Sequence, residues 1–165
     1  ANNFNDISKD NPHLVIELAR TSLGNTAQTD WLIKHACRTL LKQGQAEVMV
    51  LFGFQKPEHI EIAELMMQST VKMGESLAFS FTLATQKQAL GRLRLEYAID
   101  FLKKNGSLSR KVFKISESEV KGNSKAVVKS HSFRTISTRK YYAGNHALSI
   151  IVNGQELASM VFQVI

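Results

Sequence analysis

The period of the apolar side chains changes near Pro57, and this change constrains the fold more than any other feature of the sequence. Ahead of Pro57, apolar residues such as Leu14 and Leu18 recur at the spacings of an amphipathic helix. Beyond it, apolar and polar residues alternate, most regularly between Leu93 and Phe101. One element cannot satisfy both periods, so the sequence predicts an α plus β fold in two separate parts.

Residues 1–53 are expected to form short antiparallel helices. Asn11 and Pro12 indicate a helix start, because an Asn side chain can cap the first turn and Pro fits the first helical position. Further helix boundaries are expected at Gly24, at Thr29 or Asp30, and at Gly44. Helix pairs of this size are typical of α-solenoid repeats, in which each repeat covers its neighbour. Residues 1–9 resemble the end of another helix, so we expect the chain to begin within a repeat array.

Residues 57–165 are expected to fold as an all-β, immunoglobulin-like antiparallel sandwich of about seven strands. The strand candidates are 59–68, 77–83, 92–101, 110–116, 124–133, 145–153 and 156–165. Asn153-Gly154 is a strong signal for a tight hairpin between the last two. The charged residues that alternate within 92–101 are expected to face solvent. Tyr141 or Tyr142 stands where a tyrosine corner closes such a sandwich.

Positive charge is concentrated in one segment of the chain. The formal net charge is +7, yet residues 1–53 carry five basic and five acidic side chains. Residues 103–140 carry eleven basic side chains against Glu117 and Glu119, a local excess of nine. Such a concentration favours a polyanionic partner, and a well-solvated lysine-rich surface is the alternative.

The segment 131–142 combines cations, hydroxyls and aromatic rings. Guanidinium and ammonium groups contact phosphate, and hydroxyls fix the register of a protein on a nucleic acid. The candidate DNA-binding residues are His131, Arg134, Ser137, Thr138, Arg139 and Lys140, with Lys34 and Arg38 on one face of a helix. We expect Arg134, Arg139 and Lys140 to face solvent together. The alternatives are a solvated loop whose tyrosines pack into the sandwich and an ordinary polar helix face.

Other classes of function find little support in the residues. The sequence has no glycine-rich phosphate loop, no histidine-rich metal spacing and no nucleophile motif, so we assign no catalytic residue. Asp6 and Asp10 could form a carboxylate pair, but a solvated helix face explains them equally well. Cys37 stands alone, which excludes an intrachain disulfide and favours a cytoplasmic location. No apolar run reaches the roughly 20 residues of a membrane span. We therefore expect no metal, no cofactor and no membrane partner.

Four stretches of the chain resemble bacterial HEAT-like-repeat DNA alkylation repair proteins. Residues 1–12 resemble a junction between two repeats, and residues 29–44 (TDWLIKHACRTLLKQG) resemble the last repeat. Residues 93–101 (LRLEYAIDF) and 137–146 (STRKYYAGNH) resemble the immunoglobulin-like domain of the AlkC branch of these glycosylases. The resemblance covers essentially the whole chain.

The resemblance implies the C-terminal part of a 3-methyladenine DNA glycosylase, which excises N-alkylated bases from double-stranded DNA without a metal or an organic cofactor. In such proteins the helical array wraps the duplex and the sandwich closes on it from the other side. Their acidic catalytic residues lie mostly in earlier repeats. We therefore expect this chain to supply contacts to the DNA backbone and to be inactive alone. A competing interpretation is a protein-interaction module whose sandwich docks another protein, with the basic loop incidental.

Overall fold

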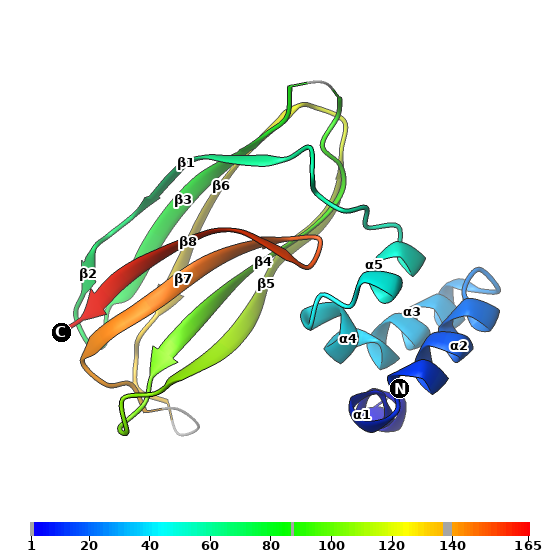
Figure 1. Ribbon diagram of the computed structural model, residues 1–165, viewed down its shortest axis with the longest axis horizontal. Helices are drawn as coiled ribbons and strands as arrows, with labels where there is room; N and C mark the ends of the chain where they lie inside the picture. The colour runs from blue at the N-terminus through cyan, green and yellow to red at the C-terminus, as the bar shows by residue number, and fades with distance from the viewer. Residues whose placement is uncertain (1, 87, 137–139) are drawn as a thin grey trace. The chain divides into compact units, whose positions relative to one another are not determined.

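Helices come first in the chain and strands follow, as the computed structural model in Figure 1 shows. The structure describes residues 2–86, 88–136 and 140–165. Contacts between residues divide the chain into two units. The helical unit comprises residues 1–56 and 153–155, and the sandwich unit comprises residues 57–152 and 156–165. The predicted α plus β class is confirmed.

The helical unit contains short helices whose ends follow local signals. Its helices are α1 (Asn2–Asp10), α2 (Pro12–Ser22), α3 (Ala27–Ala36), α4 (Arg38–Lys42) and α5 (Ala46–Leu51). Gly24 and Gly44 follow helix ends with φ of +88° and +68°, a conformation that glycine adopts at no steric cost. Among the described residues, no helix is long and apolar enough to cross a membrane.

The start of α3 differs from the sequence-based expectation. Thr26, and not Thr29 or Asp30, is the capping residue, because its Oγ1 accepts the backbone N–H of Thr29 at 3.0 Å. Asp30 lies in the first turn and accepts the N–H of Gly24 at 2.7 Å. The helix expected to run on to Gly44 is interrupted at Cys37, which separates α3 from α4.

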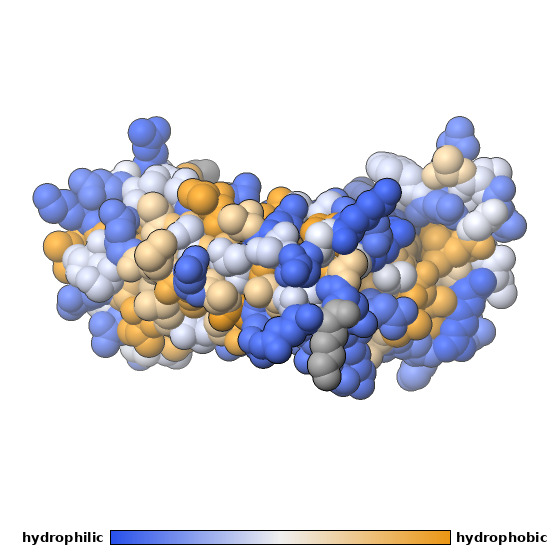
Figure 2. All heavy atoms as spheres, turned by 90° about the horizontal axis from the view of Figure 1, so that it is seen from above, coloured by the Kyte–Doolittle hydropathy of each residue, from blue (hydrophilic) through white to orange (hydrophobic). Residues whose placement is uncertain are grey.

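A small apolar core holds the helical unit together. Its buried members include Ile16, Ala19, Ile33, Leu40 and Val48. One buried polar side chain adds specificity, since Asn5 Oδ1 accepts the Thr39 N–H at 3.1 Å and the Thr39 hydroxyl at 2.9 Å. Leu14 was expected on an apolar helix face, but it is exposed, as is Trp31 of α3, because α2 and α3 bury other sides. Figure 2 shows apolar surface on this unit beside hydrophilic groups.

Two sheets form the sandwich unit. Its strands are β1 (Glu61–Met67), β2 (Thr70–Val71), β3 (Ser76–Ala84), β4 (Gly91–Leu102), β5 (Leu108–Val120), β6 (Ser124–Ser132), β7 (Gly144–Val152) and β8 (Gln155–Val164). One sheet has the order β1-β3-β6 and the other the order β2-β8-β7-β4-β5. The seven expected strands are all present within these eight. The two-residue β2, which pairs with β8 in parallel, was not predicted.

The core of the sandwich follows the alternating pattern. Leu93, Leu95, Tyr97, Ile99 and Phe101 of β4 are buried together with the alternate residues of β3 and β7. Every second side chain of a strand points to the same face, so this alternation determines which side of the sheet enters the core.

Part of the expectation for β4 was wrong. Arg94 and Glu96 alternate with the core residues as predicted, yet both are buried. Arg94 is ion-paired with Glu96 at 2.6 Å and with Glu117 of β5. Pairing of opposite charges across neighbouring positions allows these groups to leave water.

Candidate nucleic-acid interface

Two loops that are distant in sequence lie at the same end of the sandwich (Figure 1). One is the turn 103–107 between β4 and β5, and the other is the connector between β6 and β7, of which residues 133–136 and 140–143 are described. Leu102, at the end of β4, donates its N–H to His146 Nδ1 at 3.2 Å. The backbone of Gly144 approaches Leu102 so closely that an added Cβ would lie 2.6 Å from Leu102 Cδ2. The start of β7 and the end of β4 therefore hold the two loops together.

These two loops carry exposed cations and no acidic residue of their own. We call the set Lys103, Lys104, Arg134 and Lys140 the basic end of the sandwich. Within the described part of the chain, none of the four is ion-paired, and neither loop contains an acidic residue in its sequence. The adjoining turn adds Lys72 and Glu75, whose charges offset each other.

The connector is anchored by aromatic side chains at both of its ends. Phe133 is fully buried among the rings of Phe101, Tyr141 and Phe162. Tyr141 is buried as predicted, and its hydroxyl donates to the Ser132 carbonyl at 3.4 Å, the upstream backbone contact that is typical of a tyrosine corner. Anchoring of both ends reduces the entropy that the loop loses when it binds a partner.

Lys140 is held against a neighbouring ring. Its Nζ lies 5.8 Å from the centre of the Tyr142 ring, a cation–π contact that leaves the ammonium group at the surface. Tyr142 is half-buried, so it links this cation to the packed part of the connector. Tyr141 and Tyr142 therefore serve packing, and the positive charge lies beside them.

His146 connects the two loops directly. It is buried, its Nδ1 accepts the N–H of Leu102, and its Nε2–H donates to the Tyr142 carbonyl at 2.9 Å. This pattern fixes the neutral Nε2–H tautomer. Burial lowers the pKa of His146, against the opposing effect of its bond to Tyr142. Neutral His146 therefore fixes the turn and the connector relative to each other.

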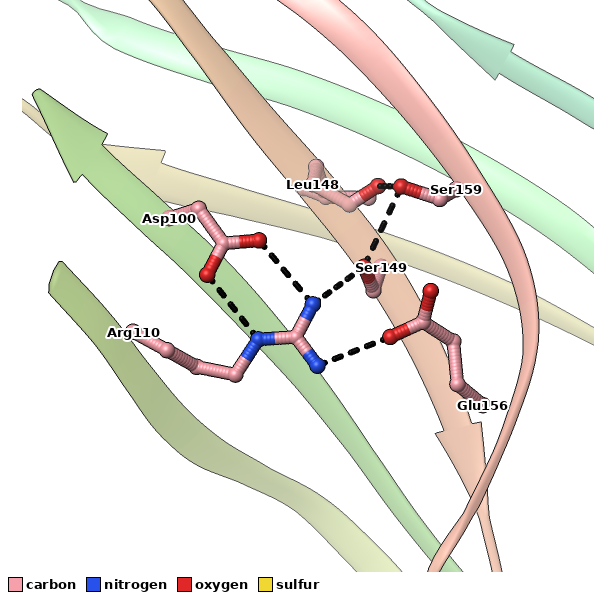
Figure 3. A network of polar contacts seen from close by, with 6 residues as sticks. All are labelled: Asp100, Arg110, Leu148, Ser149, Glu156 and Ser159. Carbon is pink, nitrogen blue, oxygen red and sulfur yellow. Dashed lines mark hydrogen bonds and ion pairs between the residues drawn. The ribbon is translucent and has the colours of Figure 1, made fainter. Parts of the chain in front are cut away.

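Several of the basic residues in 103–140 are neutralised within the sheet and lie outside the basic end. Figure 3 shows Arg110 of β5 held by both oxygens of Asp100 at 2.9 Å and by Glu156 at 2.8 Å. Arg110 also donates to Ser149 at 3.1 Å, and the pKa of its guanidinium is raised, chiefly by the hydrogen bonds to Asp100. Lys114 pairs with Glu117 at 3.1 Å. The charge excess counted from the sequence therefore overstates the positive charge that is available to a partner.

The structure separates the residues that the sequence proposed for DNA binding. Arg134 and Lys140 lie on the connector and are exposed. Ser137, Thr138 and Arg139 lie outside the described residues. His131 is not at the surface: it is buried on β6 and its Nδ1 lies 3.0 Å from the Tyr97 hydroxyl. Its register opposite Leu77 turns its ring into the core, so we remove His131 from the set of candidate contacts.

The two helical candidates differ in their surroundings. Lys34 Nζ lies 5.9 Å and 5.8 Å from the centres of the Phe52 and Phe54 rings, so packed aromatic side chains hold it. Arg38 is exposed, and its Nη1 lies 3.2 Å from His35 Nε2.

Sequence reasoning missed Lys103 and Lys104 as members of the same surface as Arg134. The signal for the turn was present, because Asn105 and Gly106 follow the long alternating strand. The sequence could not show which other loop lies at that end. Among the described residues, no group of three or more His, Cys, Asp or Glu side chains could hold a metal ion.

Comparison with known proteins places this architecture in a family. Residues 61–165 match the family model described as "Uncharacterised protein YhaZ, C-terminal Ig-like domain". The chain is 44% identical over 166 aligned positions to the protein YhaZ of Bacillus subtilis, in an alignment that covers 99% of this chain and 46% of that protein. The chain thus spans about half the length of the curated relative it matches.

Solved structures agree with this assignment. The structure of Pseudomonas fluorescens alkylpurine DNA glycosylase AlkC bound to DNA containing an abasic site analog matches with a TM-score of 0.89 at 32% identity, over 99% of this chain and 46% of that one. A β-glucosidase from Listeria innocua in complex with isofagomine matches 64% of this chain and 16% of its own, with a TM-score of 0.52 and 13% identity, which shows a shared fold alone. By its sequence and its sandwich, the chain belongs to the family defined by the C-terminal immunoglobulin-like domain of YhaZ.

Proposed function

We propose that this chain is the DNA-binding C-terminal portion of a repair glycosylase that removes N-alkylated bases from double-stranded DNA. The observation that carries the proposal is the match of 99% of the chain to the DNA-bound AlkC structure, at a TM-score of 0.89 and 32% identity. In this proposal the helices form a HEAT-like repeat fragment and the chain supplies backbone contacts, whereas catalytic residues lie elsewhere in a longer protein.

The basic end gives the proposal a physical basis. Lys103, Lys104, Arg134 and Lys140 are four exposed cations on two loops held together by His146. Lysine and arginine contacts to phosphate release condensed counterions, which drives binding and makes it strongly dependent on salt. Contacts of this kind position a protein on DNA without reading its sequence. The basic end is therefore suited to holding a duplex whatever its sequence. Ser137, Thr138, Arg139, Lys34 and Arg38 remain proposed contacts.

Salt dependence of duplex binding tests the proposal. The logarithm of the affinity falls with the logarithm of salt concentration by about 0.9 per phosphate contact. Replacing both Lys103 and Lys104 with Ala should therefore make the slope shallower by about 1.8 if each contacts a phosphate. The matched control replaces Lys121 and Lys125 with Ala. Both lysines lie where β5 ends and β6 begins, away from the basic end. If both double variants made the salt slope shallower by the same amount, the effect would come from overall charge, and the proposal would be contradicted.

Base excision needs a separate test, because binding and catalysis are different claims. The proposal expects release of alkylated base by a longer protein that includes the preceding repeats, and none above a buffer control by this 165-residue chain. Release of 3-methyladenine from alkylated duplex by the chain alone would contradict the assigned division of labour.

One surface of the sandwich favours a second function. The outward positions of β3 and β6 are small or uncharged, namely Ala78, Ser80, Thr82, Ala126, Val128 and Ser130. Val128 is 79% exposed, and with Met66 of β1 it borders a groove of about 360 Å³. Outward positions of β3 and β6 that carry no charge do not suit phosphate, but they suit another protein. Binding of a protein partner that persists at high salt and is lost on replacing Val128 with Lys would support this alternative.

A further inference from the structure

A large aromatic side chain is exposed in the middle of a polar helix face. Trp31 of α3 is 65% exposed, although α3 has a buried side formed by Ile33 and Ala36. With 100° between successive residues, Trp31 points almost directly away from Ile33. A tryptophan placed this way contributes little to the core of the helical unit, so its position calls for another explanation.

Trp31 does not stand alone on this face. Its indole stacks on the imidazole of His35, with ring centres 5.4 Å apart and planes inclined by 21°. Arg38 continues the row, since its Nη1 lies 3.2 Å from His35 Nε2, and the amide oxygen of Asn2 lies 3.0 Å from the same nitrogen. Trp31 and His35 are four residues apart on α3, and Arg38 is the first residue of α4, where its contact with His35 extends the row. The row therefore consists of two nearly parallel rings followed by a guanidinium.

A hollow lies beside the indole. It measures about 620 Å³ and is lined by Ala27, Gln28, Thr29, Trp31 and Leu32. His35 is not among the lining residues, so the hollow borders the part of Trp31 that His35 leaves uncovered. This volume lies in the range of about 300–1,000 Å³ that small-molecule sites occupy. The amide of Gln28 offers both a hydrogen-bond donor and an acceptor at the rim.

The charge on this face suits an anionic strand. Arg38 is exposed, and the nearby Asp6, whose pKa is lowered chiefly by its hydrogen bond to Lys9 and less by Arg38, is ion-paired with Lys9 at 2.7 Å. A planar ring with an adjacent guanidinium matches a nucleotide, whose base stacks on aromatic rings while its phosphate pairs with Arg.

We infer that Trp31 and His35 form a stacking platform for an unpaired nucleobase, and that Arg38 binds the phosphate of the same strand. The inference rests on the proposed DNA binding and adds to it a preference for DNA with a base outside the helical stack. Fully paired DNA presents no free base face, so it should engage the basic end of the sandwich without engaging the platform.

Intrinsic fluorescence tests the platform directly, because Trp31 is the single tryptophan of the sequence. The probes are a duplex with one unpaired bulged thymine and the same duplex fully paired. We expect the bulged duplex to quench Trp31 emission and the paired duplex to leave it nearly unchanged. Replacing Trp31 with Ala should weaken binding of the bulged duplex about fivefold or more, the usual effect of losing one aromatic stacking partner. Trp31→Phe, which keeps a ring, should retain most of the affinity.

The matched control is Leu32→Ala, which removes the neighbouring exposed apolar side chain of the same hollow. An affinity loss in Leu32→Ala equal to that in Trp31→Ala would overturn stacking and indicate an apolar docking site. Paired and bulged duplexes that bind equally, with unchanged emission from Trp31, would overturn the platform and leave the proposed function intact. Absence of binding to either duplex would overturn the proposed function as well.

Discussion

The basic end of the sandwich and the outer face of the β1-β3-β6 sheet suit opposite kinds of partner. The basic end carries four exposed cations on two loops, whereas the outward positions of β3 and β6 carry no charge. The two regions therefore separate the two functions proposed for the chain, since phosphate binding depends on salt and an apolar contact does not. The difference also shows that net charge alone does not locate an interface.

The largest effect is expected from removing the aromatic anchor of the basic end. Phe133 is fully buried, and its replacement with Ala should lower the free energy of unfolding by about 3–5 kcal/mol, the usual cost of truncating a core aromatic. Duplex binding should fall together with stability, because Phe133 holds the connector. Urea unfolding measures the first effect. Ile136→Ala on the same connector is the control, since that side chain is exposed, and a similar loss there would show that the connector is not anchored at Phe133.

The next test concerns the residue that joins the two loops. His146→Phe keeps a ring stacked on Phe162, 5.5 Å away in the native protein, and removes both hydrogen bonds. Loss of partners for the Leu102 N–H and the Tyr142 carbonyl should destabilise the protein by about 2 kcal/mol. Duplex affinity measured below the unfolding transition should also fall, because the cations on the two loops are no longer held together. Unchanged affinity in a folded variant would show that His146 serves stability alone.

The same histidine gives a pH dependence with a defined sign. Burial lowers the pKa of His146 in the folded protein below its value of about 6.5 in an unfolded chain. The unfolded state therefore binds more protons in this range, so stability should decrease as the pH falls below about 6.5 towards the folded-state pKa. Urea unfolding at a series of pH values should show this slope in the native protein and a smaller one in His146→Phe. Equal slopes in both proteins would assign the effect to another group.

A weaker effect is expected from a cation that lies outside the basic end. Arg110→Met removes the pairing partner of Asp100 and Glu156 (Figure 3), and we expect a loss of about 1 kcal/mol or less, since the Arg110 side chain is 44% exposed. The salt slope of duplex binding should stay unchanged, because the slope counts phosphates contacted rather than total charge. A salt slope as shallow as that of the Lys103 and Lys104 double variant would mean that the DNA interface extends onto the five-stranded sheet.

Particular residues show how far the sequence could predict this molecule. The alternation in β4 predicted the sandwich, and Gly24 and Gly44 predicted the ends of helices, because these signals depend on only a few neighbouring residues. The sequence could not predict that Lys103 and Lys104 lie on the same surface as Arg134, because only the pairing of β4 with β7 brings their loops together.

The misplaced His131 had a signal that could have corrected it. His131 lies four positions after the buried Val127 and two positions before the buried Phe133, so the alternation of β6 already directs its side chain to the core. The exposure of Trp31 also follows from local geometry. Trp31 and Ile33 are two residues apart in α3, so at about 100° per residue their side chains point to nearly opposite sides of the helix, and Ile33 is the one that packs into the core.

The smallest expected effect completes the comparison from the uncharged side. Val128→Lys places a charge on a side chain that is already 79% exposed, so the free energy of unfolding should change by less than about 0.5 kcal/mol. If DNA is bound at the basic end, the new lysine lies on the outer face of β6, outside the contact, and the salt slope should remain that of the native protein. If the outer face of the β1-β3-β6 sheet docks a protein, the same change buries an unpaired ammonium in the interface, which costs far more than a surface substitution. One variant with almost no effect on stability thus distinguishes the two surfaces. A steeper salt slope would mean that the duplex reaches this face. Loss of a protein partner at unchanged duplex affinity would assign the two functions to separate sides of one sandwich.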